Sequence, residues 1–310
     1  AVGLNFRDVL NVLGMYPGDP GFPGGDCAGQ IISANNNTEF CLGQNVFGVG
    51  TGALETFVFT LPGLLQPLPN GMTYEEAASL PTVLTTVHEA FINLSCITSG
   101  QRILIHGASG GVGLIAIQYA QRMGCDIIAT VGSERKRRLL KQLGVTNITS
   151  SRDPTVFKRD ISQFENVDVV LNSLSGEFIS SSVGFLKPNG HFCEIGKRDI
   201  WSQDKMSQTR SDVNYHVIAI DHMMEKETSQ FKILFKDAVS LQPDPLPIKT
   251  FSFPKLVDAF RYMQQAKHIG KVIISQPPVF KTNGTYIITG GLGSLGCLLY
   301  TSPSPRDGLL

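Results

Sequence analysis

Residues 102–120 read RILIHGASGGVGLIAIQYA, and this stretch decides the fold. A short apolar run ends in a glycine-rich turn, and an amphipathic helical pattern begins directly after it. The glycines of the turn are Gly107, Gly110, Gly111 and Gly113. Glycines let the backbone approach a dinucleotide pyrophosphate, and the N–H groups and dipole of a helix N-terminus stabilise its charge. Because the flanking strand and helix are both present, the stretch predicts nucleotide binding rather than a plain strand-to-helix turn.

The composition excludes several classes of protein. The 310 residues are enough for about two domains. Lys+Arg and Asp+Glu both number 26, so the chain lacks the basic excess expected for nucleic-acid or anionic-membrane binding. No apolar run is long enough for a membrane span and no secretory signal is visible, so we expect a cytoplasmic protein. The six cysteines form no C-x-x-C pair, which favours reduced thiols over disulfides or a structural zinc site.

The first 75 residues carry short strand-like runs that glycine and proline interrupt. This pattern predicts a compact, loop-rich β domain. Thr73 and Glu76 have the spacing of a capping box, which predicts that a helix begins after Thr73. Pro81 predicts a break before a second helix at residues 85–93.

Strand-like and helical patterns alternate from residue 102 to about residue 220, which predicts an α/β fold with a doubly wound parallel sheet. The predicted strands of this part are 103–106, 126–131, 167–172, 190–194 and 217–220. The predicted helices are 112–123, 134–143 and 176–185. Further elements expected along the chain are helices at 228–240 and 256–265 and a strand at 271–275.

The C-terminal residues begin a second strand-and-glycine pattern. Pro277-Pro278 has the composition of a linker, and residues 284–296 then read GTYIITGGLGSLG. This predicts a second nucleotide-binding start. Pro303 and Pro305 prevent a continuing helix, and we expect residues 297–310 not to be native sequence.

Six motifs stand in a family order along residues 1–276. They are GLNFRDVL at 3–10, YPG at 16–18, the glycine turn, VVLNSLSG at 169–176, EIGK at 194–197 and HIGKV at 268–272. With these motifs the chain resembles the enoyl reductase domain of polyketide synthases, and it is similar to the corresponding domain of animal fatty acid synthase. Both are zinc-free members of the medium-chain dehydrogenase/reductase superfamily.

The resemblance implies a domain organisation. A Rossmann cofactor domain would span 81–248, and a GroES-like β-rich substrate domain would combine 1–80 with 249–276. Its first strands would lie before residue 1. Residues 277–283 would be a linker, and 284–296 resemble the start of a ketoreductase domain. One departure from the family is GDCAG at 25–29, where Gly-Glu-Gly-Ala-Gly is usual.

The residues after the predicted strand 126–131 favour NADPH over NADH. An NAD site usually ends this strand with a carboxylate, whereas here Ser133, Arg135, Lys136 and Arg137 follow. A hydroxyl with cations suits a 2′-phosphate; the alternative is a solvated basic helix start, which the helix dipole disfavours. By resemblance, Ser133 and Lys136 hold the 2′-phosphate with help from Arg152, for which a plain surface role is the alternative.

We expect no metal in the site. Zinc dehydrogenases of the superfamily need cysteine and histidine ligands, and Gly25 stands where such enzymes have a histidine. No set of three Cys, His or Glu residues has suitable spacing. Hydrogen bonds and charges of the protein would then have to polarise the substrate carbonyl.

The resemblance implies reduction of a trans-2-enoyl thioester by hydride addition at the β-carbon and protonation at the α-carbon. By motif position, Tyr16 is linked to α-carbon protonation and to the 2S outcome at α-methyl branches. Lys197 would be the proton donor or enolate stabiliser, and Asp221 its acidic partner. Their structural alternatives are an aromatic packed on a proline turn, a solvated loop lysine and a helix N-cap.

Other motif residues are expected to bind the cofactor, and Thr86 could instead cap a helix. They are Thr86, Gly107, Gly110, Gly111, Val112, Gly113, Asn172, Ser173, Gly196, Gly270 and Lys271. His88, His106 and His191 are expected to be structural.

Three functions compete on these observations. The first is an NADPH-dependent enoyl reductase inside a multidomain synthase, acting on chains held by the phosphopantetheine of an acyl carrier protein and compatible with a homodimer of the parent synthase. The second is a free-standing quinone or alkenal reductase, which predicts no ketoreductase start. The third is a non-catalytic domain, which predicts a damaged glycine turn or loss of Tyr16, Lys197 or Asp221.

Overall fold

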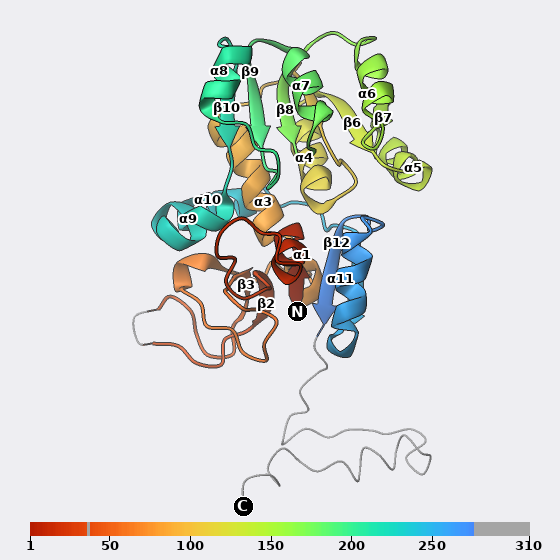
Figure 1. The fold of residues 1–310 in the computed structure, drawn as a ribbon. Helices are drawn as coiled ribbons and strands as arrows, with labels where there is room; N and C mark the ends of the chain where they lie inside the picture. The colour runs from red at the N-terminus through yellow and green to blue at the C-terminus, as the bar shows by residue number, and fades with distance from the viewer. Residues whose placement is uncertain (36–37, 276–310) are drawn as a thin grey trace, which may run out of the picture. The chain divides into compact units, whose positions relative to one another are not determined.

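The computed structural model describes residues 1–35 and 38–275, and these contain two six-stranded sheets (Figure 1). The linker expected at 277–283, the ketoreductase start at 284–296 and the tail at 297–310 lie outside the described residues. None of the described helices is both long and apolar enough to cross a membrane.

The first sheet is entirely parallel and has the strand order β10-β9-β8-β5-β6-β7. Its strands are β5 (Arg102–Ile105), β6 (Asp126–Val131), β7 (Asn147–Ser150), β8 (Val167–Asn172), β9 (Leu186–Glu194) and β10 (Asn214–Val217). The connecting helices are α4 (Gly111–Arg122), α5 (Glu134–Gln142), α6 (Pro154–Ile161), α7 (Glu177–Gly184) and α8 (Gln203–Thr209). The chain runs outward from β5 to β7 and then crosses to β8 on the other side of β5. This doubly wound order confirms the predicted α/β fold, and ligands of such sheets bind at the switch point.

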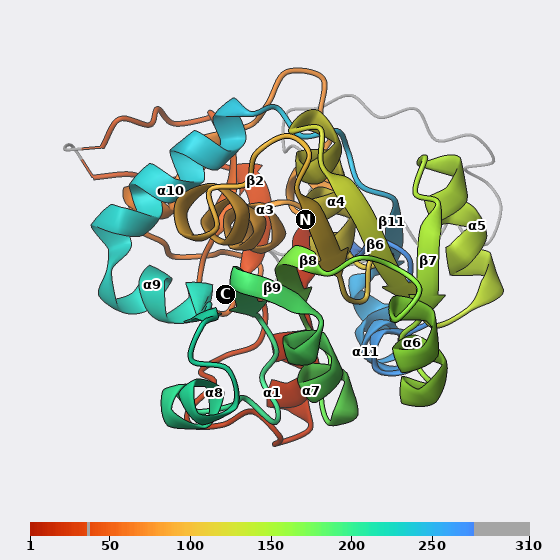
Figure 2. The ribbon, with the colours of Figure 1, turned by 90° about the horizontal axis from the view of Figure 1, so that it is seen from above.

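Helices cover both faces of the parallel sheet (Figure 2). Ile103 and Ile105 of β5 pack in one apolar cluster with α4 and with α3 (Pro81–His88), whereas Leu104 packs in another with α6 and α7. All three side chains have no exposed surface. A strand buried on both faces is a continuous apolar run, which is why the sequence pattern located these strands.

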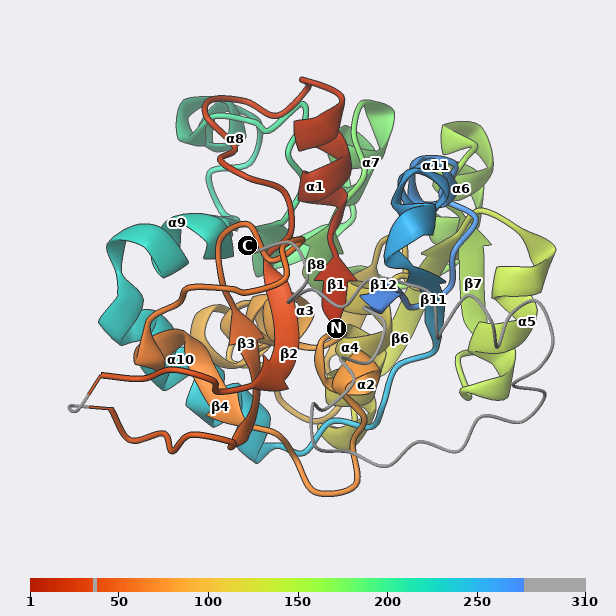
Figure 3. The same ribbon diagram turned by 90° about the horizontal axis from the view of Figure 1, so that it is seen from below.

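The second sheet has the order β11-β12-β1-β2-β3-β4 and joins the two ends of the described chain (Figure 3). Its strands are β1 (Val2–Leu4), β2 (Asp26–Gln30), β3 (Asn45–Val49), β4 (Leu65–Pro67), β11 (Ile248–Ser252) and β12 (Lys271–Ser275). β1 pairs antiparallel with both β12 and β2, so Val2 lies opposite Ile274 and Cys27. The remaining helices are α1 (Phe6–Val12), η1 (Pro62–Leu64), α2 (Tyr74–Ala77), α3 (Pro81–His88), η2 (Glu89–Leu94), α9 (Ile220–Lys226), α10 (Thr228–Ser240), η3 (Phe253–Lys255) and α11 (Leu256–Gln264).

Several local predictions are confirmed and others are wrong. The capping box is present, because Thr73 accepts a hydrogen bond from the Glu76 backbone and Glu76 accepts one in return. The predicted break between two helices is present at residues 78–80. The second helix, however, begins at Pro81 and not at residue 85, because a proline at the first helical position loses no hydrogen bond. The strand predicted at 217–220 is wrong: β10 ends at Val217, and α9 begins at Ile220.

The β-rich part also contains a helix that the sequence pattern did not predict. α1 begins after Asn5, whose backbone N–H donates to the carboxylate of Asp8 at 2.7 Å. Asp8 is buried and also accepts a 2.8 Å hydrogen bond from the backbone of Gly24, which anchors α1 against the following loop. This helix brings Arg7 to the cavity described below.

Candidate active site

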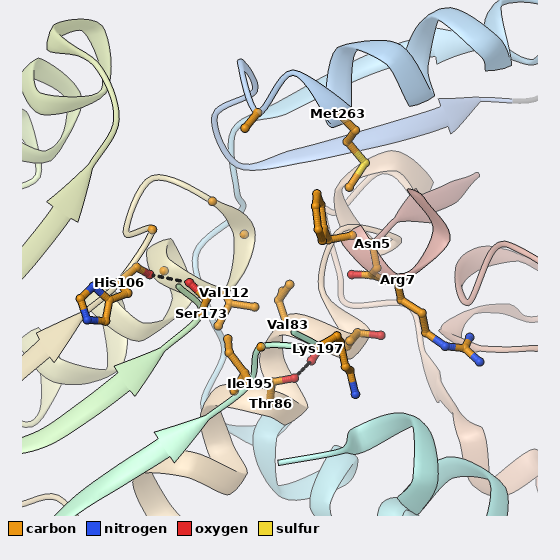
Figure 4. A pocket seen from close by; sticks show the side chains of 18 of the residues that line it. Asn5, Arg7, Val83, Thr86, His106, Val112, Ser173, Ile195, Lys197 and Met263 are labelled. Atoms are coloured by element: carbon orange, nitrogen blue, oxygen red, sulfur yellow. Dashed lines mark hydrogen bonds between the residues drawn. The ribbon is translucent and has the colours of Figure 1, made fainter. Parts of the chain in front are cut away.

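A cavity of about 460 Å³ lies between the two sheets. Figure 4 shows Val112 and Ser173 on one side of it and Asn5 and Arg7 on the other. The parallel sheet therefore supplies one wall and the β-rich sheet supplies the opposite wall.

The glycine turn lines this cavity with the residues that were expected to bind the cofactor: Gly107, Gly110, Gly111, Val112 and Gly113. Gly107 has a φ of 59°, a conformation that side chains other than glycine rarely adopt. A Cβ on Gly113 would lie 2.4 Å from Cα of Ala108, so only glycine lets α4 pack this close to the turn. Gly111, Val112 and Gly113 form the first turn of α4 and line the cavity, and the N–H groups of a helix's first turn are the groups that can bind an anion.

Two cations stand in the cavity beyond the end of β6. Lys136 and Arg152 both line it, and no carboxylate among the described residues pairs with either of them. Nζ of Lys136 donates to the carbonyl of Ala266 at 2.8 Å. Burial, followed by the charge of Arg152, lowers the pKa of Lys136, so an anion there would relieve the repulsion. Ser133 is the N-cap of α5 and is not a lining residue.

The three predicted catalytic residues meet at the cavity. Nζ of Lys197 lies 3.0 and 3.1 Å from the two carboxylate oxygens of Asp221, and the hydroxyl of Tyr16 donates to the same carboxylate. Lys197 and Asp221 line the cavity, whereas Tyr16 reaches Asp221 from outside the lining. Lys197 follows β9, and Asp221 lies in the first turn of α9 rather than at a strand end.

Arg7 belongs to this cluster although the sequence pattern did not single it out. Its Nε lies 3.7 Å from Asp221, and its guanidinium carbon lies 5.2 Å from the ring centroid of Tyr16. Burial opposes ionisation of Asp221, but the Tyr16 hydrogen bond and the charges of Lys197 and Arg7 outweigh it and lower its pKa. Burial, then the bond to Asp221, raises the pKa of Tyr16, so its phenol stays protonated. The sequence motif that contains Arg7 could be recognised, but the helix α1, which brings Arg7 to Asp221, could not be predicted from the sequence pattern.

Five further residues that were expected to bind the cofactor line the cavity: Thr86, Ser173, Gly196, Gly270 and Lys271. Thr86 is not an N-cap, because it lies inside α3 and its hydroxyl donates to the carbonyl of Thr82 at 2.6 Å. Lys271 lines the cavity, but its ammonium group points to protein partners rather than being free for a ligand.

The expectation that Asn172 lines the cleft is wrong. Asn172 has no exposed surface and donates to the carboxylate of Glu194 at 2.7 Å and to the carbonyl of Leu174 at 2.9 Å. It therefore fixes the ends of β8 and β9 behind the cavity. Burial raises the pKa of Glu194 to about 7.

The histidines expected to be structural have partners in the core. His106 contacts the hydroxyls of Ser182 at 2.8 Å and Thr130 at 3.2 Å, and burial lowers its pKa to about 3. His88 contacts the hydroxyl of Tyr119 at 3.2 Å. His191 lies 3.1 Å from His216, nitrogen to nitrogen.

His268 lines the cavity and was not predicted as a site residue. Burial and the charges of Lys136 and Lys271 lower its pKa to about 4, so its ring is neutral. Its Nδ1 is buried without a hydrogen-bond partner among the described residues. Within residues 1–35 and 38–275, no group of three or more His, Cys, Asp or Glu side chains could hold a metal ion.

The chain is similar to known proteins over most of its own length. A family model described as zinc-binding dehydrogenase matches residues 111–235. Polyketide synthase GfsB of Streptomyces halstedii is 36% identical over 304 residues, which cover 96% of this chain and 5% of that protein. The chain spans between 5% and 17% of the length of the curated relatives it matches.

Solved structures match over most of their length. The CurK enoyl reductase is 37% identical with a TM-score of 0.80, and the CurF ER cyclopropanase from the curacin A pathway is 33% identical with a TM-score of 0.82. Both alignments cover 89% of this chain and 89% of the other chain. The chain therefore belongs to the enoyl reductases of polyketide synthases, oxidoreductases of the medium-chain dehydrogenase/reductase superfamily.

Proposed function

We propose that this chain uses NADPH to reduce the α,β-double bond of a trans-2-enoyl thioester held by the phosphopantetheine of an acyl carrier protein. The observation that carries the proposal is the ion pair of Lys197 and Asp221, which lines the same cavity as the glycine turn. One similar structure is described as an ER cyclopropanase, so members of this family can differ in the reaction that they catalyse.

The cavity fits NADPH at two separate points. The start of α4 offers backbone N–H groups for the pyrophosphate, and Gly113 allows the close approach. Lys136 and Arg152 line the cavity and would hold the 2′-phosphate. We keep Ser133 as a third candidate, although it lies outside the lining and its hydroxyl caps α5 by accepting from the Lys136 backbone. β6 ends at Val131 and is followed by Gly132 and Ser133, so no carboxylate lies at the strand end where an NADH site binds the ribose hydroxyls. The next residue, Glu134, pairs with Arg137 and Arg138 and does not line the cavity. Bound NADPH supplies the hydride.

The cluster around Asp221 would stabilise the enolate that forms on the thioester oxygen when hydride reaches the β-carbon. Asp221 accepts two N–H groups of Lys197, which leaves the third for the enolate oxygen. A charged donor already oriented toward the place where the oxyanion forms stabilises it. The electron pair of the double bond moves toward the thioester oxygen and returns to take a proton at the α-carbon.

The α-carbon can receive its proton from Lys197 or from Tyr16. The Tyr16 hydroxyl points its proton at Asp221, so it must rotate before it can donate to substrate. The raised pKa of Tyr16 keeps this proton in place at neutral pH. Because Lys197 and Tyr16 both lie at the Asp221 carboxylate and either can donate, we expect that neither is indispensable for proton transfer.

The wider assembly is also part of the proposal. The curated relatives are polyketide synthases many times longer than this chain, which supports neighbouring synthase domains as partners. We place the chain in a cytoplasmic synthase, with a ketoreductase domain following and a dimer formed through the parent protein.

The test is turnover of a crotonyl pantetheine thioester by the purified protein with NADPH and, in parallel, with NADH. We expect rapid oxidation of NADPH, slow oxidation of NADH and a saturated thioester as product. Reduction of quinones or alkenals without reduction of the thioester would instead favour the free-standing reductase. Binding of NADPH without any turnover would favour the non-catalytic domain.

A further inference from the structure

Lys271 is a buried cation in the wall of the cofactor cavity. Its Nζ lies 3.0 Å from Oδ2 of Asp26 and 2.6 Å from Oδ1 of Asn5. The side chains of Lys271 and Asp26 are only 4% and 0% exposed. Two of the three N–H groups of the ammonium are therefore used inside the protein, and at 4% exposure little surface is left through which a phosphate could reach the third.

Asp26 uses its whole acceptor capacity inside the protein. Oδ1 accepts from the backbone N–H of Thr82 at 3.0 Å and from its hydroxyl at 2.5 Å. Oδ2 accepts from the side-chain amide of Asn5 at 2.9 Å and from Lys271. A carboxylate has about four acceptor sites, so the charge of Asp26 is fully satisfied and leaves none for a ligand. We call Asn5, Asp26, Thr82 and Lys271 the buried hub.

The buried hub joins elements that carry active-site residues. Asn5 is the N-cap of α1, which presents Arg7 to Asp221. Thr82 is the second residue of α3, whose next turn presents Thr86 to the cavity. Asp26 begins β2 and Lys271 begins β12, so the hub sets where both helices start relative to the β-rich sheet.

Lys271 also touches the wall formed by the parallel sheet. A Cβ on Gly111, the first residue of α4, would lie 2.8 Å from Cδ of Lys271, so the lysine stem packs directly on the glycine turn. The preceding residue, Gly270, donates its N–H to the carbonyl of Ser109 at 2.9 Å and forms a bridge with Gly110. Lys271 thus contacts the glycine turn with the aliphatic stem of its side chain and the β-rich sheet with its ammonium group.

We propose that the Lys271–Asp26 ion pair is a positioning pair, which holds the two walls of the cofactor cavity at their working separation. On this view Lys271 affects NADPH through Asn5, the start of α3 and Gly111, and it is not itself a phosphate ligand. The inference rests on the proposed function only for the identity of the cofactor.

A double-mutant cycle separates a positioning pair from a phosphate ligand. The proteins are Asp26→Asn, Lys271→Met, the double variant and the control Lys267→Met, which removes an exposed lysine outside the cavity lining. The readout is the Kd of NADPH by fluorescence titration, without substrate, at low and high salt. Each single change leaves one buried group without its charge partner, whereas the double variant leaves none.

We expect each single variant to weaken NADPH binding by on the order of tenfold and the double variant to bind more tightly than either. The control should match wild type. Two results together would overturn the proposal. Asp26→Asn would bind NADPH as well as wild type or better, and Lys271→Met would lower NADPH affinity by the same factor in the wild-type and in the Asp26→Asn background. That pattern identifies Lys271 as a direct phosphate ligand.

Two further readouts distinguish positioning from mere stability. Asp26→Glu keeps the negative charge, so it should recover most of the NADPH affinity that Asp26→Asn loses. This comparison is informative even if Asp26→Asn folds poorly. The kinetic isotope effect with 4-deuterated NADPH should rise in Asp26→Asn, because a misplaced nicotinamide slows hydride transfer. If Asp26→Asn only lowered the folded fraction, the isotope effect would keep its wild-type value and the apparent Kd would rise only by the inverse of the folded fraction. That result would contradict the proposal. Wild type inactive on thioesters would refute the proposed function, while the binding cycle would still test the pair.

Discussion

Lys197 and Asp221 form a two-point ion pair, with Nζ at 3.0 Å from one carboxylate oxygen and 3.1 Å from the other. The two residues lie on different elements, one after β9 and one in the first turn of α9. Asp221 also accepts from Tyr16 and faces Arg7, so one carboxylate orients every candidate proton donor of the site.

Lys197→Met is therefore expected to lower kcat by about 100-fold, because the enolate loses its charged hydrogen-bond donor. The Kd of NADPH should stay within about threefold of the wild-type value, because the glycine turn and Lys136 are untouched. Steady-state kinetics with a crotonyl thioester and a binding titration check the two parts. Lys187→Met, which removes a lysine paired with Asp168 away from the cavity, is the matched control. A kcat equal to wild type in Lys197→Met would exclude the assigned role.

Tyr16→Phe is expected to lower kcat by about tenfold, less than the about 10²–10⁴ of a lost sole general acid, because Lys197 can still donate. The clearer effect should be on α-methyl substrates, where the configuration of the product becomes mixed. Chiral chromatography of the product measures this. Tyr74→Phe removes the hydroxyl of a tyrosine on α2 and serves as control. Unchanged configuration together with unchanged kcat would place Tyr16 outside the reaction.

Lys136→Ala and Arg152→Ala should each weaken NADPH binding by about 10- to 100-fold, the cost of losing a charge-assisted hydrogen bond. NADH binding should be unaffected, because NADH lacks the 2′-phosphate. Titration of both cofactors measures the change in preference. Lys141→Ala changes an exposed lysine later on the same helix α5 and should alter neither value. Equal losses for both cofactors would show that these cations act elsewhere than on the 2′-phosphate.

Gly113→Ala should destabilise the fold by about 1–3 kcal/mol, because the added Cβ would meet the backbone of Ala108. NADPH affinity should fall as well, since α4 must move away from the glycine turn. Urea unfolding and a cofactor titration measure the two effects. Gly184→Ala, where no atom lies within 4 Å of the added Cβ, should be tolerated. Equal stability of the two variants would mean that α4 does not need the close approach.

Burial of neutral His106 should make the protein less stable in mild acid. Its pKa falls from 6.5 to about 3 on folding, so between these values the unfolded chain binds a proton that the folded protein does not. The stabilising contribution is fully present above pH 6.5 and is lost as the pH falls toward 3, by at most about 1.4 kcal/mol per pH unit. The free energy of unfolding of His106→Asn should therefore depend less steeply on pH than that of wild type.

The same comparison with His222→Asn gives the control, because His222 is exposed. That variant should retain the wild-type pH dependence. If His106→Asn and wild type lost stability in parallel between pH 7 and pH 5, His106 would not be the neutral buried group described.

The sequence could predict those elements whose pattern depends on local burial. β6, β8, α10 and β12 lie at the residues predicted for them, because continuous apolar runs or helical periods mark their buried faces. The start of α9 could not be located in this way, since the apolar run from Val217 to Ile220 includes both the end of a strand and the start of a helix. α1 is short and lies among glycine and proline turns, so its cap at Asn5 was the only local indication of it.

Site residues could be predicted where a sequence motif identifies them. They could not be predicted where their role depends on a tertiary contact with a residue far away in the sequence. Tyr16, Lys197 and Asp221 were recognised by resemblance, and the structure brings them together. Arg7 and Lys271 depend on tertiary contacts: the partner of Lys271, Asp26, lies 245 residues away in sequence. Nothing in a local pattern separates a buried, paired lysine from one that binds a ligand.

The most direct measurement is the position of deuterium in the product after reaction of a crotonyl thioester with 4-deuterated NADPH, read by mass spectrometry and NMR. We expect a saturated thioester with one deuterium at the β-carbon and a solvent-derived proton at the α-carbon. Deuterium found elsewhere, or consumption of NADPH without a saturated thioester, would contradict the assignment of this cavity as the site of enoyl reduction.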